Sequence, residues 1–167
     1  MEIKVLMDNV SRGDLLSEWG LSVYIAYGQK HILLDGGTTG EFVKNAQAMG
    51  VDLSQIDFAV LSHAHYDHAD GLEAFFEKNG HAKVYLREGA EENCYKETEE
   101  GYKYIGIKPG LLQRYASRFQ FINGDFSPEP GIFLLPHKSE GMEEAGKKAR
   151  MFVKKGDQWQ QDAFAHE

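Results

Sequence analysis

Three histidines and an aspartate are crowded into the stretch HAHYDHADG, residues 63–71. Imidazole suits zinc, iron, nickel and copper, and a carboxylate adds a hard oxygen ligand. In an extended segment residues i and i+2 point the same way, so His63 and His65 can bind one ion together. Asp67 and His68 follow the turn and can face a second ion. Because the cluster contains no thiolate, a structural four-cysteine site is excluded, and a hydrolytic site with an open coordination position is favoured.

The elements that flank this cluster follow from the hydrophobic pattern. Residues 57–62, DFAVLS, predict a short apolar strand, and the histidines begin where it ends. Asp70 and Glu73 have the spacing of a capping box, which predicts a helix directly after the cluster. A further strand at 82–86 completes a strand–loop–helix–strand unit. The cluster is therefore expected between a buried strand and a capped helix.

The rest of the chain also reads as alternating strands and helices, which indicates an α/β fold. Thr38 and Glu41 form another capping box before a predicted helix, and a helix is expected after Pro109. Residues 87–108 are interpreted as a short helix plus an insertion over one rim. The remaining expectations are strands at 3–7, 22–27, 31–35, 119–123 and 131–136, a polar loop at 137–150 and a hairpin at 151–161.

Length and charge limit the classes of function. With 167 residues, a single domain is the default. The net charge of −8 argues against nucleic acid as a partner, because no basic stripe is present. No apolar run is long enough to span a bilayer, and no signal peptide is evident. Cys94 is the single cysteine, which favours a reducing cytoplasm; its use as a nucleophile is disfavoured.

Two groups of residues have ordinary structural interpretations. The histidines outside the cluster are assigned to the surface or the core: His31, His81, His137 and His166. The tyrosines of the 87–108 segment are assigned to packing, with stacking on a ring such as a pterin as the alternative: Tyr95, Tyr102 and Tyr104.

HAHYDHADG and the upstream LLDGG, residues 33–37, resemble the signature of the metallo-β-lactamase superfamily. The similarity covers nearly the whole chain, and residues 8–25 and 32–72 are similar to its dihydropterin ribofuranosylaminobenzene-phosphate synthase-like branch. The resemblance implies an αββα sandwich with a metal centre at one edge of the sheets. It also implies that Asp35 hydrogen-bonds a metal ligand, although an aspartate before Gly-Gly is also ordinary turn chemistry.

The resemblance further implies a metal-dependent hydrolase. His63 and His65 would bind the first metal, and Asp67 and His68 the second, with Asp67 also assigned to catalysis. A metal-held water would attack an ester, phosphoester or related bond of a small molecule. Zinc is the expected cofactor, with iron or manganese as alternatives and up to two ions in a complete site.

The sequence departs from the family pattern after His68. The family supplies a further histidine, a bridging carboxylate and a last histidine from its C-terminal half, and the surroundings of His137 and His166 match none of them. Residues 1–167 are therefore interpreted as one domain truncated at its C-terminus, an incomplete sandwich with weak or partial metal binding. Its exposed sheet face is expected to self-associate or to bind a partner chain. The alternative function is accordingly a non-catalytic or partner-dependent fragment; a nuclease is disfavoured by the charge.

Overall fold

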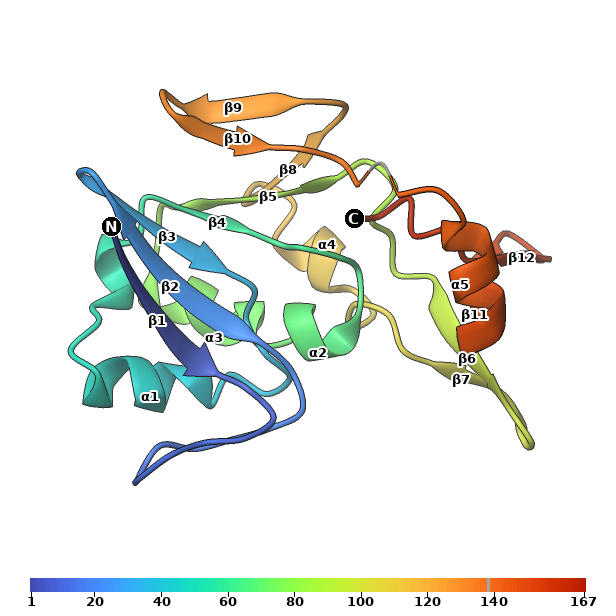
Figure 1. Ribbon diagram of the computed structural model, residues 1–167, viewed down its shortest axis with the longest axis horizontal. Helices are drawn as coiled ribbons and strands as arrows, with labels where there is room; N and C mark the ends of the chain where they lie inside the picture. Colours follow the sequence, from blue (N-terminus) through green and yellow to red (C-terminus); the bar gives the residue numbers. More distant parts are fainter. Residues whose placement is uncertain (138) are drawn as a thin grey trace.

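The computed structural model describes residues 1–137 and 139–167, and its largest element is a six-stranded sheet (Figure 1). The strand order is β1-β2-β3-β4-β5-β8, antiparallel from β1 to β3 and parallel from β3 to β8. The strands predicted here are confirmed: β1 (Glu2–Met7), β2 (Ser22–Tyr27), β3 (Lys30–Leu34), β4 (Phe58–Val60), β5 (Lys83–Arg87) and β8 (Phe119–Ile122).

The main core lies between this sheet and the helices below it in Figure 1. It joins Leu33, Ala59 and Val84 of the sheet to Phe42 and Phe75 of the helices, all of them fully buried. The elements on this side are α1 (Phe42–Ala48), η1 (Leu53–Gln55), α2 (Tyr66–Ala69), α3 (Leu72–Lys78) and α4 (Leu111–Arg114). Strands β3, β4 and β5 are thus fixed in place by packing against these helices.

Helices α1 and α3 occur where predicted, but both predicted capping boxes are wrong. Neither helix has a side-chain cap. The Thr38 hydroxyl donates to the backbone carbonyl of Trp19, and Glu41 does not reach back to it but pairs with Lys44. Asp70 Oδ1 instead accepts the backbone N–H of Lys108, 2.7 Å away. These side chains therefore make other contacts instead of the helix caps that the local sequence pattern predicted.

A second, antiparallel sheet with the order β12-β11-β6-β7 lies beside the first. Its strands are β6 (Cys94–Thr98), β7 (Gly101–Tyr104), β11 (Met151–Lys155) and β12 (Gln158–Gln161). The hairpin predicted at 151–161 is confirmed. The short helix predicted within 87–108 is wrong, because this segment forms the β6–β7 hairpin, in which Tyr95 contacts Tyr104 and Tyr102 stacks on Trp159 with ring centroids 3.9 Å apart. These ring contacts agree with the packing interpretation of the tyrosines.

Helix α5 (Met142–Ala149) packs against β11 and β12, so the polar loop predicted at 137–150 is wrong over these residues. Its acidic first turn and basic last turn complement the helix dipole. Lys138, within the same predicted loop, lies outside the described residues.

Strands β9 (Phe126–Glu129) and β10 (Ile132–Leu134) form a hairpin on the other side of the large sheet from α1–α3 (Figure 1). The strand predicted at 131–136 is confirmed. The Phe126 ring contacts that of Tyr85, with centroids 5.2 Å apart, which ties the hairpin to β5. Within residues 1–137 and 139–167, no helix combines the length and the apolar character needed to cross a bilayer.

Candidate metal centre

The predicted site residues lie at one edge of the large sheet because β3 and β4 are parallel neighbours. Asp35 follows β3 and Ser62 follows β4, so the carboxyl ends of these strands bring the two residues together. The loop that starts at Asp35 also approaches the start of α3 very closely. A Cβ atom on Gly71 would lie 1.9 Å from the carbonyl oxygen of Gly36, so only glycine fits there.

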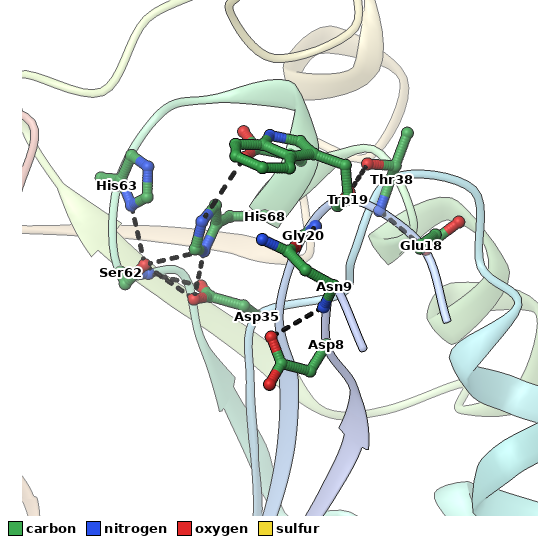
Figure 2. A network of polar contacts seen from close by, with 11 residues as sticks. Asp8, Asn9, Glu18, Trp19, Gly20, Asp35, Thr38, Ser62, His63 and His68 are labelled. Carbon is green, nitrogen blue, oxygen red and sulfur yellow. Dashed lines mark hydrogen bonds and ion pairs between the residues drawn. The ribbon is translucent and has the colours of Figure 1, made fainter. Parts of the chain in front are cut away.

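Asp35 is fully buried, and its carboxylate is the centre of a hydrogen-bond network (Figure 2). Oδ1 accepts the backbone N–H of Ser62 at 2.7 Å, and Oδ2 accepts the Ser62 hydroxyl at 2.7 Å. Oδ2 also lies 2.8 Å from Nδ1 of His68. The backbone φ of 60° at Asp35 is in the left-handed region, which aspartate tolerates better than most residues. The side chain therefore does more than form a turn, because it orients His68.

The same network sets the tautomers of two histidines. The Ser62 hydroxyl donates its single proton to Asp35, so toward His63 Nδ1, 2.9 Å away, it acts as an acceptor. The Nδ1 atoms of His63 and His68 therefore carry the protons, and each Nε2 keeps a free lone pair. This is the arrangement that fixes an imidazole for metal binding.

His63, Asp67 and His68 are half-buried, and each offers a donor atom within 4.8 Å of the others. Nε2 of His68 lies 3.8 Å from Oδ2 of Asp67. The rings of His63 and His68 lie with centroids 4.0 Å apart. Two imidazoles and one carboxylate at a partly open sheet edge match the three-ligand set of a catalytic zinc site.

Burial and neighbouring charges adjust the protonation of these histidines. Burial, with His68 and His65 nearby, lowers the pKa of His63 far below its ordinary value, so its imidazole is neutral at neutral pH. Burial also disfavours the charged form of His68, but the hydrogen bond and negative charge of Asp35 outweigh it and raise the pKa of His68. A cation that binds Nε2 of His68 would therefore compete with a proton for that atom.

His65 belongs to a different group of donors from the one that the sequence suggested. Its donor atom lies within 4.8 Å of those of Cys94, Asp162 and His166, and all four residues are buried. Asp162 and His166 are not among the site residues predicted from the sequence, but the His166 ring lies with its centroid 5.3 Å from that of His65 and 6.1 Å from that of His63. The spacing of four residues between Asp162 and His166 is a weak signal, and no surrounding motif accompanies it.

The sequence profile of the metallo-beta-lactamase superfamily matches residues 20–150. The chain belongs to the metallo-beta-lactamase superfamily. Among solved structures, it is similar to Tm1679, described as a metal-dependent hydrolase of the beta-lactamase superfamily. The TM-score is 0.77 at 27% identity, over 99% of this chain and 58% of that one. The fold is also that of MEM-A1, a subclass B3 metallo-beta-lactamase from a soil metagenome library, with a TM-score of 0.50 at 16% identity over 83% of this chain and 53% of that one.

Curated relatives align over shorter stretches. Uncharacterized protein MJ0448 of Methanocaldococcus jannaschii is 33% identical over 108 residues, which are 63% of this chain and 40% of that protein. An anaerobic nitric oxide reductase flavorubredoxin of Vibrio vulnificus is 36% identical over 70 residues, 40% of this chain and 14% of that protein. The chain thus spans less than half the length of these two relatives.

The metallo-beta-lactamase superfamily implies a divalent metal, and the donor chemistry fits one. His63 presents a neutral imidazole, and Asp67 presents a carboxylate oxygen beside His68 Nε2. His65 Nε2 is buried and has no hydrogen-bond partner among the described residues, so it is also available to a cation.

Proposed function

We propose that the chain is a metal-dependent hydrolase that acts on an ester, phosphoester or related bond of a small molecule. The observation that carries the proposal is the hydrogen-bond network of Asp35 and Ser62, which leaves Nε2 of both His63 and His68 free beside Asp67. Hydrogen-bond partners that orient histidine side chains in this way are typical of a metal-binding site. His63, Asp67 and His68 would hold the cation, which we expect to be zinc, with iron or manganese as alternatives.

When bound, the cation would acidify a water molecule and polarise the bond to be hydrolysed. Asp35 holds the His68 ring in place and keeps its proton on Nδ1. Ser62 does the same for His63. Asp67 is the proposed catalytic residue, because one of its carboxylate oxygens can bind the cation while the other accepts a proton from the attacking water.

A pocket next to the site supports a small molecule as substrate. It has a volume of about 360 Å³ and reaches from Ser62 to Glu167. Tyr85, Phe133 and Leu135 give it apolar walls, and Arg87 adds a charged group. An apolar cavity with a few polar groups is the usual form of a small-molecule site.

The second candidate function is a non-catalytic or partner-dependent fragment of such an enzyme. The observation that favours it is the small set of open donors: among the described residues, His63, Asp67 and His68 form one group of three, which is enough for one catalytic ion and too few for two. A cytoplasmic location is proposed for either function, on the ground of the single cysteine.

Metal analysis and hydrolysis assays test the hydrolase proposal together. The purified protein is expected to contain a divalent metal and to cleave members of a panel of small esters and phosphodiesters, with loss of turnover in chelator. His63→Ala is expected to lose this turnover, whereas His81→Ala, at an exposed histidine, keeps it. Undiminished turnover in His63→Ala contradicts the hydrolase. A folded wild-type chain that binds metal but cleaves nothing in the panel supports the fragment instead.

A further inference from the structure

We propose that His166, oriented by Asp162, is a positioning residue for the metal centre. Its Nδ1 atom accepts the backbone N–H of Ala64, which lies between His63 and His65, and thereby holds both imidazoles toward one ion. The inference rests on the metal centre of the proposed hydrolase. It assigns a role to two buried groups that the proposed chemistry does not use.

The loop after β4, which carries these two histidines, is held at both of its ends. The backbone N–H of Ser62 donates to Oδ1 of Asp35 at 2.7 Å. The backbone N–H of Tyr66 donates to the carbonyl of Ile105 at 3.0 Å. These contacts fix the ends of the loop but not the peptide between the two histidines.

Ala64 supplies the middle contact. The residue is fully buried, so its N–H group cannot reach water and requires an acceptor inside the protein. Nδ1 of His166 lies 3.2 Å from this nitrogen. The N–H belongs to the peptide that joins His63 to Ala64, so the contact fixes the direction of the backbone toward His63 on one side and His65 on the other. Their rings are adjacent, with centroids 4.7 Å apart.

Asp162 sets the tautomer that this contact needs. A backbone N–H can only donate, so Nδ1 of His166 carries the lone pair and Nε2 carries the proton. Nε2 lies 3.2 Å from Oδ2 of Asp162, and Oδ1 of Asp162 accepts the backbone N–H of Phe164 at 2.8 Å. Burial by itself would raise the pKa of Asp162, but the contacts with His166 and Phe164 outweigh it and lower this pKa. The carboxylate is therefore ionised at neutral pH and keeps the proton of His166 on Nε2.

Close backbone packing holds the pair in place. A Cβ atom on Gly146 would lie 2.0 Å from the carbonyl oxygen of Asp162, and one on Gly89 would lie 2.6 Å from that of Ala165. Asp162 and His166 are both fully buried. Because burying such a polar pair is costly, its contact with the loop between the metal ligands gives it a purpose beyond packing.

The same contacts argue against His166 as a metal ligand. Both of its ring nitrogens are engaged, Nδ1 by Ala64 and Nε2 by Asp162. His65 differs, because its Nε2 is buried and has no hydrogen-bond partner within residues 1–137 and 139–167. His65 can therefore offer a lone pair to the cation together with His63, whereas His166 supports the backbone between them.

Two substitutions at His166 separate positioning from packing. His166→Phe keeps a ring but removes the acceptor, whereas His166→Asn restores an acceptor oxygen at the branch point that Nδ1 occupies. Zinc affinity is measured by competition with a chromophoric chelator. His166→Phe should bind zinc roughly 10- to 100-fold more weakly than wild type, and His166→Asn should recover most of this loss. Phe42→Leu, which loosens the core at α1, should bind zinc as wild type does.

The visible absorption of cobalt-substituted protein adds a readout that a loss of stability alone does not change. The d–d bands of Co²⁺ report how the ligands are arranged around the ion, so His166→Phe should alter them. His166→Asn and Phe42→Leu should keep them. The proposal is overturned if His166→Phe matches wild type in zinc affinity and cobalt spectrum, or if His166→Asn is as weak as His166→Phe.

NMR of the metal-free wild type tests the hydrogen bond even where His166→Phe fails to fold. The nitrogen shifts of His166 should show an unprotonated Nδ1 and a protonated Nε2, and the amide of Ala64 should exchange slowly with solvent. A proton on Nδ1, or fast exchange at Ala64, overturns the proposal. These measurements do not use turnover. A chain that meets them without cleaving any substrate contradicts the hydrolase and not the role of His166.

Discussion

Nδ1 of His68 lies 2.8 Å from Oδ2 of Asp35, a carboxylate that is fully buried and shares its remaining contacts with Ser62. This hydrogen bond turns the free nitrogen of His68 toward Asp67. Asp35 directly follows β3, and His68 lies in α2, after the loop that follows β4, so the parallel pairing of β3 and β4 sets the direction of the imidazole.

Asp35→Asn is expected to disturb His68 without removing a metal ligand. The neutral amide no longer stabilises a proton on His68, so the pKa of His68 should fall when measured by NMR on chelated protein. Metal affinity or hydrolysis should drop by roughly 10- to 100-fold, as for other partners that orient metal-bound histidines. Asp14→Asn, at an exposed position, is the matched control. An unchanged His68 pKa in Asp35→Asn would contradict the role assigned to this carboxylate.

Gly71→Ala is expected to destabilise the protein, because the new methyl group would meet the carbonyl oxygen of Gly36 at 1.9 Å. Overpacking against backbone should reduce the free energy of unfolding by at least about 2 kcal/mol. Gly80→Ala is the control, since a Cβ atom there meets nothing within 4 Å. Urea denaturation measures both variants. Equal stabilities for the two would show that the loop after β3 and the start of α3 are not packed as described.

Chelated protein is expected to lose stability as the pH falls below about 6.5, the ordinary pKa of histidine. Burial lowers the pKa of His63 strongly and that of His65 to about 4 in the folded chain. The unfolded chain therefore binds more protons over this range, and the stabilisation present above pH 6.5 is lost as the pH falls toward 4. The urea midpoint at successive pH values measures this loss.

Asp70 opposes this trend, because burial raises its pKa to about 6, and its contribution to stability is lost as the pH rises through that value. Comparison with His65→Gln cancels the effect of Asp70, which both proteins retain. His65→Gln should show a weaker decline of the midpoint between pH 6.5 and 4 than wild type, and His81→Gln an equal one. Identical declines in all three proteins would contradict the burial of a neutral His65.

Self-association through the exposed apolar side chains near β8 and β10 is also expected. Phe121, Phe133 and Leu135 are 47%, 67% and 60% exposed, and burial of exposed apolar side chains against a second copy is favourable. Sedimentation should show a dimer that dissociates on dilution and is lost in Phe133→Ser. Val10→Ser, at another exposed apolar residue, should leave it intact. A monomer at every loading concentration would refute this expectation.

The secondary structure could be predicted best where the sequence has a clear local pattern of apolar residues. The strands from β1 to β5 and the placement of His63 in the loop after β4 follow from short apolar runs bounded by turns. Helix α5 could not be predicted this way, because its sequence MEEAGKKA is polar and contains Gly146, which is needed for a contact with a distant segment rather than for the helix.

The buried donors were missed for a related reason. Asp162 and His166 have no motif around them, and Cys94 lies in a polar, acidic stretch that resembles a surface insertion. Their proximity to His65 depends on the pairing of β6 with β11, a tertiary contact that periodicity does not encode. The tautomers set by Ser62 were equally beyond the sequence, because they require the distances between side chains.

The hydrogen bond from the N–H of Ala64 to Nδ1 of His166 joins residues 102 positions apart. Contacts of such high contact order form late, because the chain must lose the entropy of a long loop before they stabilise it. During refolding, the helices and the first hairpin should therefore appear well before residues 162–166 dock. Formation of the contact between Ala64 and His166 would then be a kinetic marker for the last step of folding.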